Sequence, residues 1–252
     1  MTDGPTTGQP GRRVWPWMTL AALVAAAGFA LHSPWLALHE IEIVGAVHAD
    51  PAPFIAEAGI GEGAILIWVD TGRVARAVAA DPWVADVRVE RVWPDRLVVE
   101  VLERVPVAWI EGITTWMLVA SDGTVLDTGE APGGGHLRAA LAFPDLVPGD
   151  RPADPTWGEI VDLANTLRDD IGGTMTVELR GTELWTETSG HPVRLGYPID
   201  LADKGRTLLA LLQVEIPFGA TIDVSSPLRP AINDGTETTS PQAAVEGSDN
   251  EV

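Results

Sequence analysis

An apolar run near the N-terminus constrains this chain most strongly. It extends from Val14 to Leu31 with a single threonine as its only polar member. If Ser33 and Pro34 lie in the membrane interface, the run continues to residue 38. A helix that spans a bilayer needs about 20 apolar residues. Tryptophans near both ends suit the two interfaces. We therefore predict a transmembrane signal anchor over residues 14–38.

The flanking charges predict how this anchor is oriented. Arg12 and Arg13 precede the apolar run, whereas Glu40, Glu42 and Asp50 follow it. Basic residues favour the cytoplasmic side. We expect residues 1–13 to be a cytoplasmic tail and the remaining chain to lie outside the cytoplasmic membrane. The small residues Ala25–Ala27 leave open the alternative of a cleaved signal peptide.

The composition excludes several classes of function. The chain has 16 Lys+Arg against 36 Asp+Glu, a net charge of −20, and no cysteine. Such an acidic chain is unsuited to binding nucleic acid or anionic headgroups through a basic face. Without cysteine there is no disulfide, no thiolate nucleophile and no cysteine-based zinc site. No nucleic acid or small-molecule substrate is expected as a partner.

Residues 39–106 have the pattern of a small α+β domain. Ile41 and Ile43 alternate with Glu42 as in a strand, and Asp50-Pro51 is typical of a helix start. A second helix begins near Asp70, and two strands follow it on either side of the turn Trp93–Asp95. The predicted order is β-α-α-β-β.

Residues 107–232 form a second, β-rich region. Ser121–Gly123 lies between two apolar strands and predicts a hairpin. A helix is expected after Asp154-Pro155, and strands over 175–179, 183–188 and 193–195. A helix over 203–213 and a last strand over 220–224 complete a domain in which helices pack on an antiparallel sheet. The acidic tail, 233–252, has almost no apolar residue and is predicted to be disordered.

This ordered set of motifs resembles one bacterial family. The stretch Val87–Leu97, and the exit Glu103-Arg104-Val105-Pro106-Val107-Ala108, resemble the closing hairpin of a POTRA domain. The later order Val193–Gly196, Lys204, Ile222–Ser225 resembles the β domain that follows it in the FtsQ/DivIB cell-division family. The resemblance implies an α+β bitopic protein with one anchor, a POTRA domain and a β domain, enriched at the division septum.

The residues offer no constellation for catalysis. None of the five histidines has metal-ligand spacing, and Ser189-Gly190-His191 lacks the strand–turn–helix setting of a nucleophile elbow. Lys204, the only lysine, is interpreted either as one half of a local ion pair or as a positioning residue of the β domain. We expect no catalytic residue, no metal ligand and no cofactor, and hence a protein that is not an enzyme.

The family resemblance implies protein partners instead. It implies binding of the small bitopic division proteins FtsB and FtsL at the C-terminal end of the β domain, and a part in controlling septal peptidoglycan synthesis. An exposed strand edge can receive such a partner. The predicted receiving edge is the last strand, with the partner-binding residues Thr221, Ile222, Asp223, Val224 and Ser225.

Two alternatives stay open at this point. Residues 221–225 could be an ordinary closing strand without a partner. The whole chain could also be a POTRA-containing accessory protein of envelope assembly or secretion. Such a protein would be expected to carry repeated POTRA units or barrel strands, which the sequence does not display.

Overall fold

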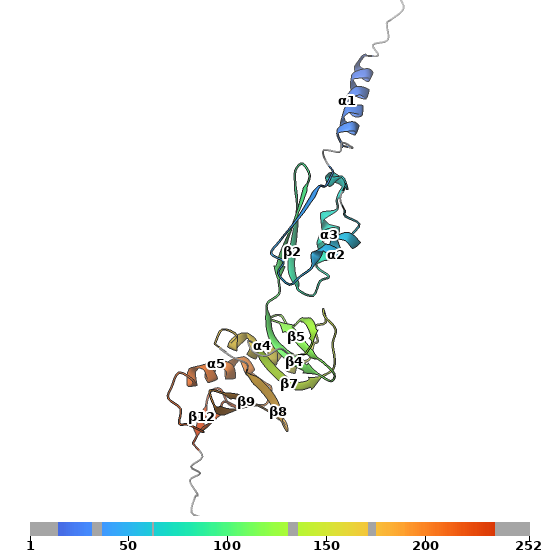
Figure 1. Cartoon of the computed structure of the whole chain (residues 1–252). Helices are drawn as coiled ribbons and strands as arrows, with labels where there is room; N and C mark the ends of the chain where they lie inside the picture. The colour runs from blue at the N-terminus through green and yellow to red at the C-terminus, as the bar shows by residue number, and fades with distance from the viewer. Residues whose placement is uncertain (1–14, 32–36, 62, 131–135, 171–174, 235–252) are drawn as a thin grey trace, which may run out of the picture. The chain divides into compact units, whose positions relative to one another are not determined.

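The computed structural model describes residues 15–31, 37–61, 63–130, 136–170 and 175–234 (Figure 1). The chain divides into two compact units, Met1–Glu103 and Arg104–Val252, which are called unit 1 and unit 2 below. The predicted cytoplasmic tail, 1–13, and most of the predicted acidic tail lie outside the described residues.

The apolar run forms a helix, α1, over Trp15–Leu31. It has 17 residues, and its described side chains from Trp17 to Ala25 are exposed. No helix in the described part of the chain is long and apolar enough to cross a membrane. The predicted extension runs through residues 32–36, which are not described. Leu38, predicted to end the anchor, is instead buried in the core of unit 1.

The folded part of unit 1 has the predicted β-α-α-β-β order, with an added single turn of 3₁₀ helix, η2. Its elements are β1 Glu40–Val44, α2 Pro51–Glu57, η2 Leu66–Trp68, α3 Thr71–Val78, β2 Val84–Val92 and β3 Arg96–Glu103. The sheet order is β1-β3-β2, in which β1 runs parallel to β3 and β2 antiparallel to it. Buried Leu, Ile and Val side chains from the sheet, α2, η2 and α3 form one core.

Local chemistry places the helices of unit 1. The carboxylate of Asp50 accepts the amide of Ala52 and caps α2, and the carboxylate of Asp70 accepts the amide of Arg73 and caps α3. The turn after β1 needs a glycine, because a Cβ at Gly45 would lie 2.2 Å from the carbonyl oxygen of Val101.

Unit 2 is built around one mixed sheet. The sheet strands are β4 Pro106–Gly112, β5 Trp116–Ala120, β6 Val125–Gly129, β7 Leu137–Phe143, β8 Thr176–Arg180, β9 Glu183–Thr188, β10 His191–Gly196, β11 Thr221–Asp223 and β12 Ala231–Asn233. Within the described residues their order is β12-β11-β10-β9-β8-β7-β4-β5-β6. The helices are α4, Pro155–Leu167, and α5, Leu201–Leu211.

The prediction of an antiparallel sheet was wrong. Three neighbouring pairs run parallel, namely β4 with β7, β7 with β8, and β10 with β11. Each parallel pair needs a crossover connection. The β5–β6 hairpin connects the first pair, α4 the second and α5 the third. The alternation of apolar and polar residues along a strand does not specify which strand pairs with which.

Both helices of unit 2 pack on the sheet and enclose its core (Figure 1). Trp157, in the first turn of α4, is 2% exposed and donates its indole N–H to the carbonyl of Gly123 at 3.0 Å. Gly123 has φ +86° in the predicted β5–β6 turn. This hydrogen bond therefore connects the predicted hairpin to the helix that covers it.

Candidate interaction site

The predicted receiving strand is not at the edge of the sheet. β11 lies between β10, to which Val193 pairs with Ile222, and β12, in which Ile232 pairs with Ile222. Ile222 and Val224 are fully buried. The prediction that Thr221–Ser225 form a free edge was therefore wrong, because the chain turns back after Ser225 and adds one more strand.

Pro227 lies in the connection that makes this reversal. The carbonyl of Ser226 accepts the amide of Arg229, closing a tight turn. The carbonyl of Pro227 accepts the hydroxyl of Thr207 on α5 at 3.3 Å, which attaches the turn to the helix. β11 ends at Asp223, before the chain reaches Pro227, so the limit that Pro227 was expected to set on strand pairing stays a prediction. The sequence did not reveal the short strand that follows the turn.

β12 is the edge strand at this end of the described sheet. Its three residues, Ala231–Asn233, are all exposed and pair on one side only, with β11. Asn233 was predicted to begin the disordered tail, but it pairs with Thr221. The outer side of β12 offers backbone donors and acceptors that no described strand uses.

The strand at the opposite edge of the sheet, β6, is covered at its first residue by another segment of the chain. In β6, the amide of Val125 donates to the carbonyl of Asp150, and the carbonyl of Val125 accepts the amide of Gly149. Val125 is also fully buried. The segment 147–150 thus occupies backbone groups that an added strand would need, so β12 is the more accessible edge.

Exposed apolar side chains surround this C-terminal edge. Leu228, in the turn before β12, is 92% exposed, and Ile232 on β12 is 39% exposed. Tyr197 and Ile199 are also exposed and line a shallow hollow of about 320 Å³. Other residues of the hollow come from β9, β10, the loop between β10 and α5, α5 itself and the connection after β11: Glu183, Arg194, Gly196, Asp200, Lys204, Ser225 and Pro227.

A three-membered ion cluster crosses the strands beside this hollow. Arg194 of β10 donates to Glu183 of β9 at 2.5 and 2.8 Å, and to Asp223 of β11 at 3.0 Å. The hydrogen bonds that Arg194 donates to Glu183 lower the pKa of the Glu183 carboxyl. Burial raises the pKa of Asp223, but bonds from Ser225 and Arg194 outweigh it and lower the pKa. The cluster fixes β9, β10 and β11 beside the edge strand.

Lys204 is buried, with 4% of its surface exposed, and its ammonium donates to the carbonyl of Tyr197 at 2.7 Å. Burial lowers the pKa of Lys204, against the opposing effect of Asp200 and Glu159. Of its two interpretations, the geometry supports the positioning role. The side chain connects α5 to the loop after β10.

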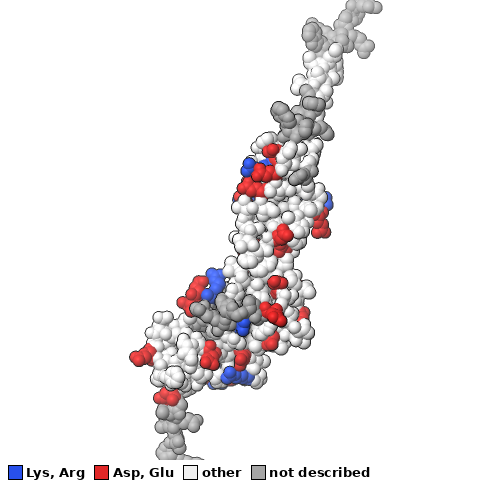
Figure 2. All heavy atoms as spheres, viewed as in Figure 1, with Lys and Arg blue, Asp and Glu red and all other residues white. Residues whose placement is uncertain are grey.

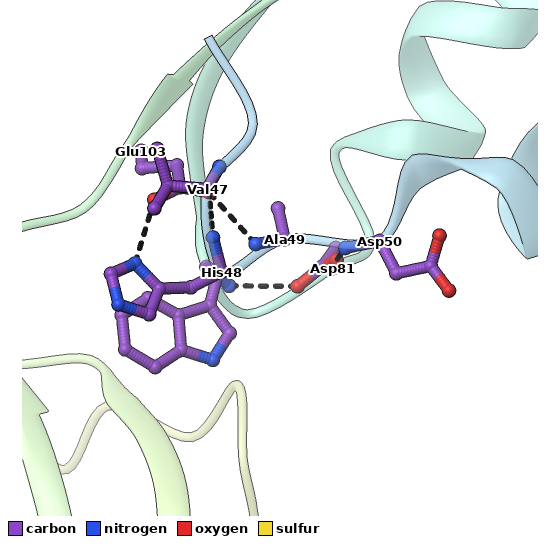
Figure 3. A network of polar contacts seen from close by, with 7 residues as sticks. Val47, His48, Ala49, Asp50, Asp81 and Glu103 are labelled. Atoms are coloured by element: carbon purple, nitrogen blue, oxygen red, sulfur yellow. Dashed lines mark hydrogen bonds and ion pairs between the residues drawn. The ribbon is translucent and has the colours of Figure 1, made fainter.

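A second polar network lies in unit 1 at the end of β3. The carboxylate of Glu103 accepts the backbone amides of Val47, His48 and Ala49 at 2.6 to 2.7 Å, and contacts the His48 ring at 3.1 Å (Figure 3). Burial raises the pKa of Glu103, but these hydrogen bonds outweigh it and lower the pKa to about 2. The His48 ring also stacks on Trp83 at 4.6 Å.

The surface carries few basic groups. On the face in Figure 2, acidic side chains occur on both units and basic ones form only small groups. No cluster of three or more His, Asp or Glu that could hold a metal ion occurs in the residues that the structure describes. His191, expected in a turn, instead begins β10, is buried, and contacts the carbonyl of Ala220 at 3.1 Å.

Comparison with known proteins decides the family. Residues 36–104 match the family described as "POTRA domain, FtsQ-type". The "Cell division protein FtsQ" of Streptomyces bingchenggensis is 31% identical over 210 residues, which cover 79% of this chain and 77% of that protein. The chain belongs to the FtsQ family.

Two further FtsQ proteins extend this likeness. That of Mycolicibacterium smegmatis is 30% identical over 228 residues, or 88% of this chain, and that of Corynebacterium glutamicum is 32% identical over 116 residues, or 46% of this chain. The alignment covers 65% of the M. smegmatis protein and 52% of the C. glutamicum protein. The resemblance predicted from the Glu-Arg-x-Pro-x-Ala exit and the motifs around it is confirmed.

The FtsQ-type POTRA match ends where unit 1 ends. It covers residues 36–104, and the structure places the boundary between Glu103 and Arg104. The predicted boundary, after residue 106, falls instead within the next strand, since β4 begins at Pro106. In this FtsQ-family chain the Glu103 network therefore closes the POTRA domain at its C-terminal end.

Proposed function

We propose that this chain is a single-pass membrane scaffold of the bacterial division machinery. It binds small bitopic division proteins of the FtsB and FtsL type outside the membrane and helps control septal peptidoglycan synthesis. Membership of the FtsQ family and the names of its relatives support a role in cell division. The function is one of presenting surfaces, and the proposal involves no catalytic step.

The observation that carries the binding proposal is the open edge of β12. A partner segment in extended conformation can add to Ala231–Asn233 through backbone hydrogen bonds. Its side chains would contact the exposed Leu228 and Ile232, and the hollow beside Tyr197. In this proposal β11, which contains the first of the predicted receiving residues Thr221–Ser225, is the neighbouring strand that pairs with the edge strand β12.

A three-residue edge binds weakly by itself, so the surrounding surface must contribute. Backbone hydrogen bonds each add about 0.5–1.5 kcal/mol net, and apolar burial adds about 25 cal/mol per Å². The exposed apolar residues near the edge supply that second contribution. Specificity would then depend on which side chains the partner presents to them.

The proposed topology places α1 in the cytoplasmic membrane, with the N-terminus in the cytoplasm and both units outside. The apolar helix Trp15–Leu31 and the distribution of charges in the sequence support this arrangement. The protein would concentrate at the division septum.

Depletion combined with imaging tests the proposed function. A fluorescent protein fused to the N-terminus of the full chain should form a band at the division site in the native host, and depletion of the untagged protein should give filamentous cells. The fusion should restore division in the depleted cells. A uniform envelope signal with normal division on depletion would contradict the proposal.

A further inference from the structure

Two large aromatic side chains in unit 1 are exposed although neither belongs to the edge described above. Trp68, the last residue of η2, is 64% exposed, and Trp93, in the β2–β3 turn, is 55% exposed. An indole carries a large apolar surface and one N–H donor, so it is favoured where one side is apolar and the other is wet. Neither side chain packs in the core of unit 1.

The two tryptophans lie at the same end of unit 1. The guanidinium of Arg91, two residues before Trp93, donates to the carbonyl of Val69 at 2.6 Å, and Val69 directly follows Trp68. This hydrogen bond joins the end of η2 to the end of β2. Trp68 and Trp93 therefore both lie within two residues of this hydrogen bond, although they are 25 positions apart in the sequence.

The chain from α1 enters unit 1 at this same end. The amide of Leu38 donates to the carbonyl of Ala64 at 2.6 Å, and the amide of His39 donates to the carbonyl of Asp95 at 2.9 Å. Both contacts lie within a few residues of a tryptophan. Because α1 ends at Leu31, the connection to residue 37 spans at most about 20 Å, even fully extended.

The charges at this end do not favour attraction to anionic lipid. Arg96 pairs with Glu40 and Glu42, each at 3.1 Å, and Asp95 adds another carboxylate. Among these residues and Arg91, three carboxylates outnumber two guanidinium groups. A membrane contact at this end would depend on the aromatic rings and would respond weakly to anionic headgroups.

We propose that Trp68 and Trp93 seat this end of unit 1 in the headgroup region of the lipid bilayer. The inference rests on the proposed membrane anchor, because the short connection between that anchor and unit 1 keeps these side chains close to the membrane surface. Tryptophan is enriched at that depth because its ring is amphipathic. This contact, called the tryptophan seat below, restricts the orientation of the POTRA domain relative to the membrane, independently of any protein partner.

The cysteine-free chain allows a direct test with one fluorescent label. The full-length protein is labelled with the dye NBD at Val92→Cys, next to Trp93, and reconstituted in phosphatidylcholine vesicles with and without a headgroup nitroxide lipid. Quenching is the loss of fluorescence that the nitroxide lipid causes. The control label is at Leu102→Cys, which is 64% exposed near the far end of β3. Leu102 lies six positions after Arg96, a strand length of about 20 Å.

The label beside Trp93 should be quenched more strongly than the label at Leu102. Adding Trp68→Ser and Trp93→Ser should reduce quenching at Val92→Cys toward the control value, whereas Phe218→Ser, which removes a 99% exposed aromatic ring from unit 2, should not. When both tryptophans are present, replacing part of the phosphatidylcholine with phosphatidylglycerol should leave the quenching of the label at Val92→Cys nearly unchanged.

Flotation of the same vesicles separates the two proposals. If the protein floats with the vesicles but the two labels are quenched equally, or the double serine variant keeps its quenching, the tryptophan seat is wrong while the anchor stands. If the protein does not float with the vesicles, the anchor is wrong and the seat fails with it. Near-ultraviolet circular dichroism of each variant checks that unit 1 is folded.

Discussion

Glu103 and Arg104 are consecutive residues whose side chains are bound in different units. Glu103 accepts three backbone amides from residues 47–49 of unit 1, and Arg104 donates to Asp122 of unit 2 at 2.9 Å. Burial raises the pKa of Asp122, but the bonds from Arg104 and Thr124 outweigh it and lower the pKa. Each of the two side chains is therefore bound within its own unit.

Replacing Glu103 by glutamine should destabilise unit 1. The glutamine retains the shape and one acceptor oxygen but loses the charge, and hydrogen bonds to charged groups contribute about 1.5–3 kcal/mol each. We expect the free energy of unfolding to fall by about 1–3 kcal/mol in chemical denaturation. The matched control is Glu100→Gln, an exposed carboxylate on the same strand, which should have little effect. Equal losses for both variants would contradict the network's role.

The Glu103 contribution should disappear in acid. Its pKa falls from 4.5 in the unfolded chain to about 2 in the folded protein, so folding favours the ionised form. The stabilisation is fully present above 4.5 and is lost as the pH falls from 4.5 toward 2. The difference in unfolding free energy between the native chain and Glu103→Gln should be constant near neutral pH and shrink in this window. A difference independent of pH would refute the charge argument.

Removing Arg194 should leave two carboxylates facing each other beside the edge strand. Arg194→Met is expected to lower the unfolding free energy of unit 2 by more than the loss of one isolated surface pair does, because a network of bonds contributes more than such a pair. The control is Arg206→Met on α5, where a single exposed pair with Asp203 is lost, with an expected cost below about 1 kcal/mol. Thermal unfolding at low and high salt measures both, and salt should reduce the difference.

Two helical glycines should respond oppositely to alanine. In a helix interior alanine is favoured over glycine by about 1 kcal/mol. Gly158 of α4 has open space around the new Cβ, so Gly158→Ala should stabilise unit 2. At Gly205 of α5 the Cβ would lie 2.9 Å from the Leu163 Cδ1 atom, which belongs to a fully buried side chain. Gly205→Ala should therefore destabilise unit 2, and equal gains in melting temperature would show that the helices can move apart.

The sequence predicted the elements that local chemistry specifies. Asp154-Pro155 marked the start of α4, and Asp122-Gly123 marked the β5–β6 turn, where Gly123 indeed has positive φ. The alternation of Val87 and Val89 with charged residues predicted β2. In each case the signal lies within a few neighbouring residues.

The missed elements depend on distant contacts. β7, Leu137–Phe143, is rich in alanine and has little strand character, but it is held between the parallel neighbours β4 and β8. β12 has only three residues after Pro230, too few for any periodic signal. The partners of Glu103 are more than 50 positions away, so the motif that revealed the family did not reveal its contacts.

Photo-crosslinking in dividing cells tests whether the β12 edge receives a partner strand. A photoreactive amino acid at Ile232 on β12 is compared with one at Ile113, which is 72% exposed between β4 and β5 in the same unit. We expect a crosslink from Ile232 to a small bitopic division protein and no crosslink to that protein from Ile113. Crosslinks to that protein from Ile113 but not from Ile232 would contradict the assignment of this edge.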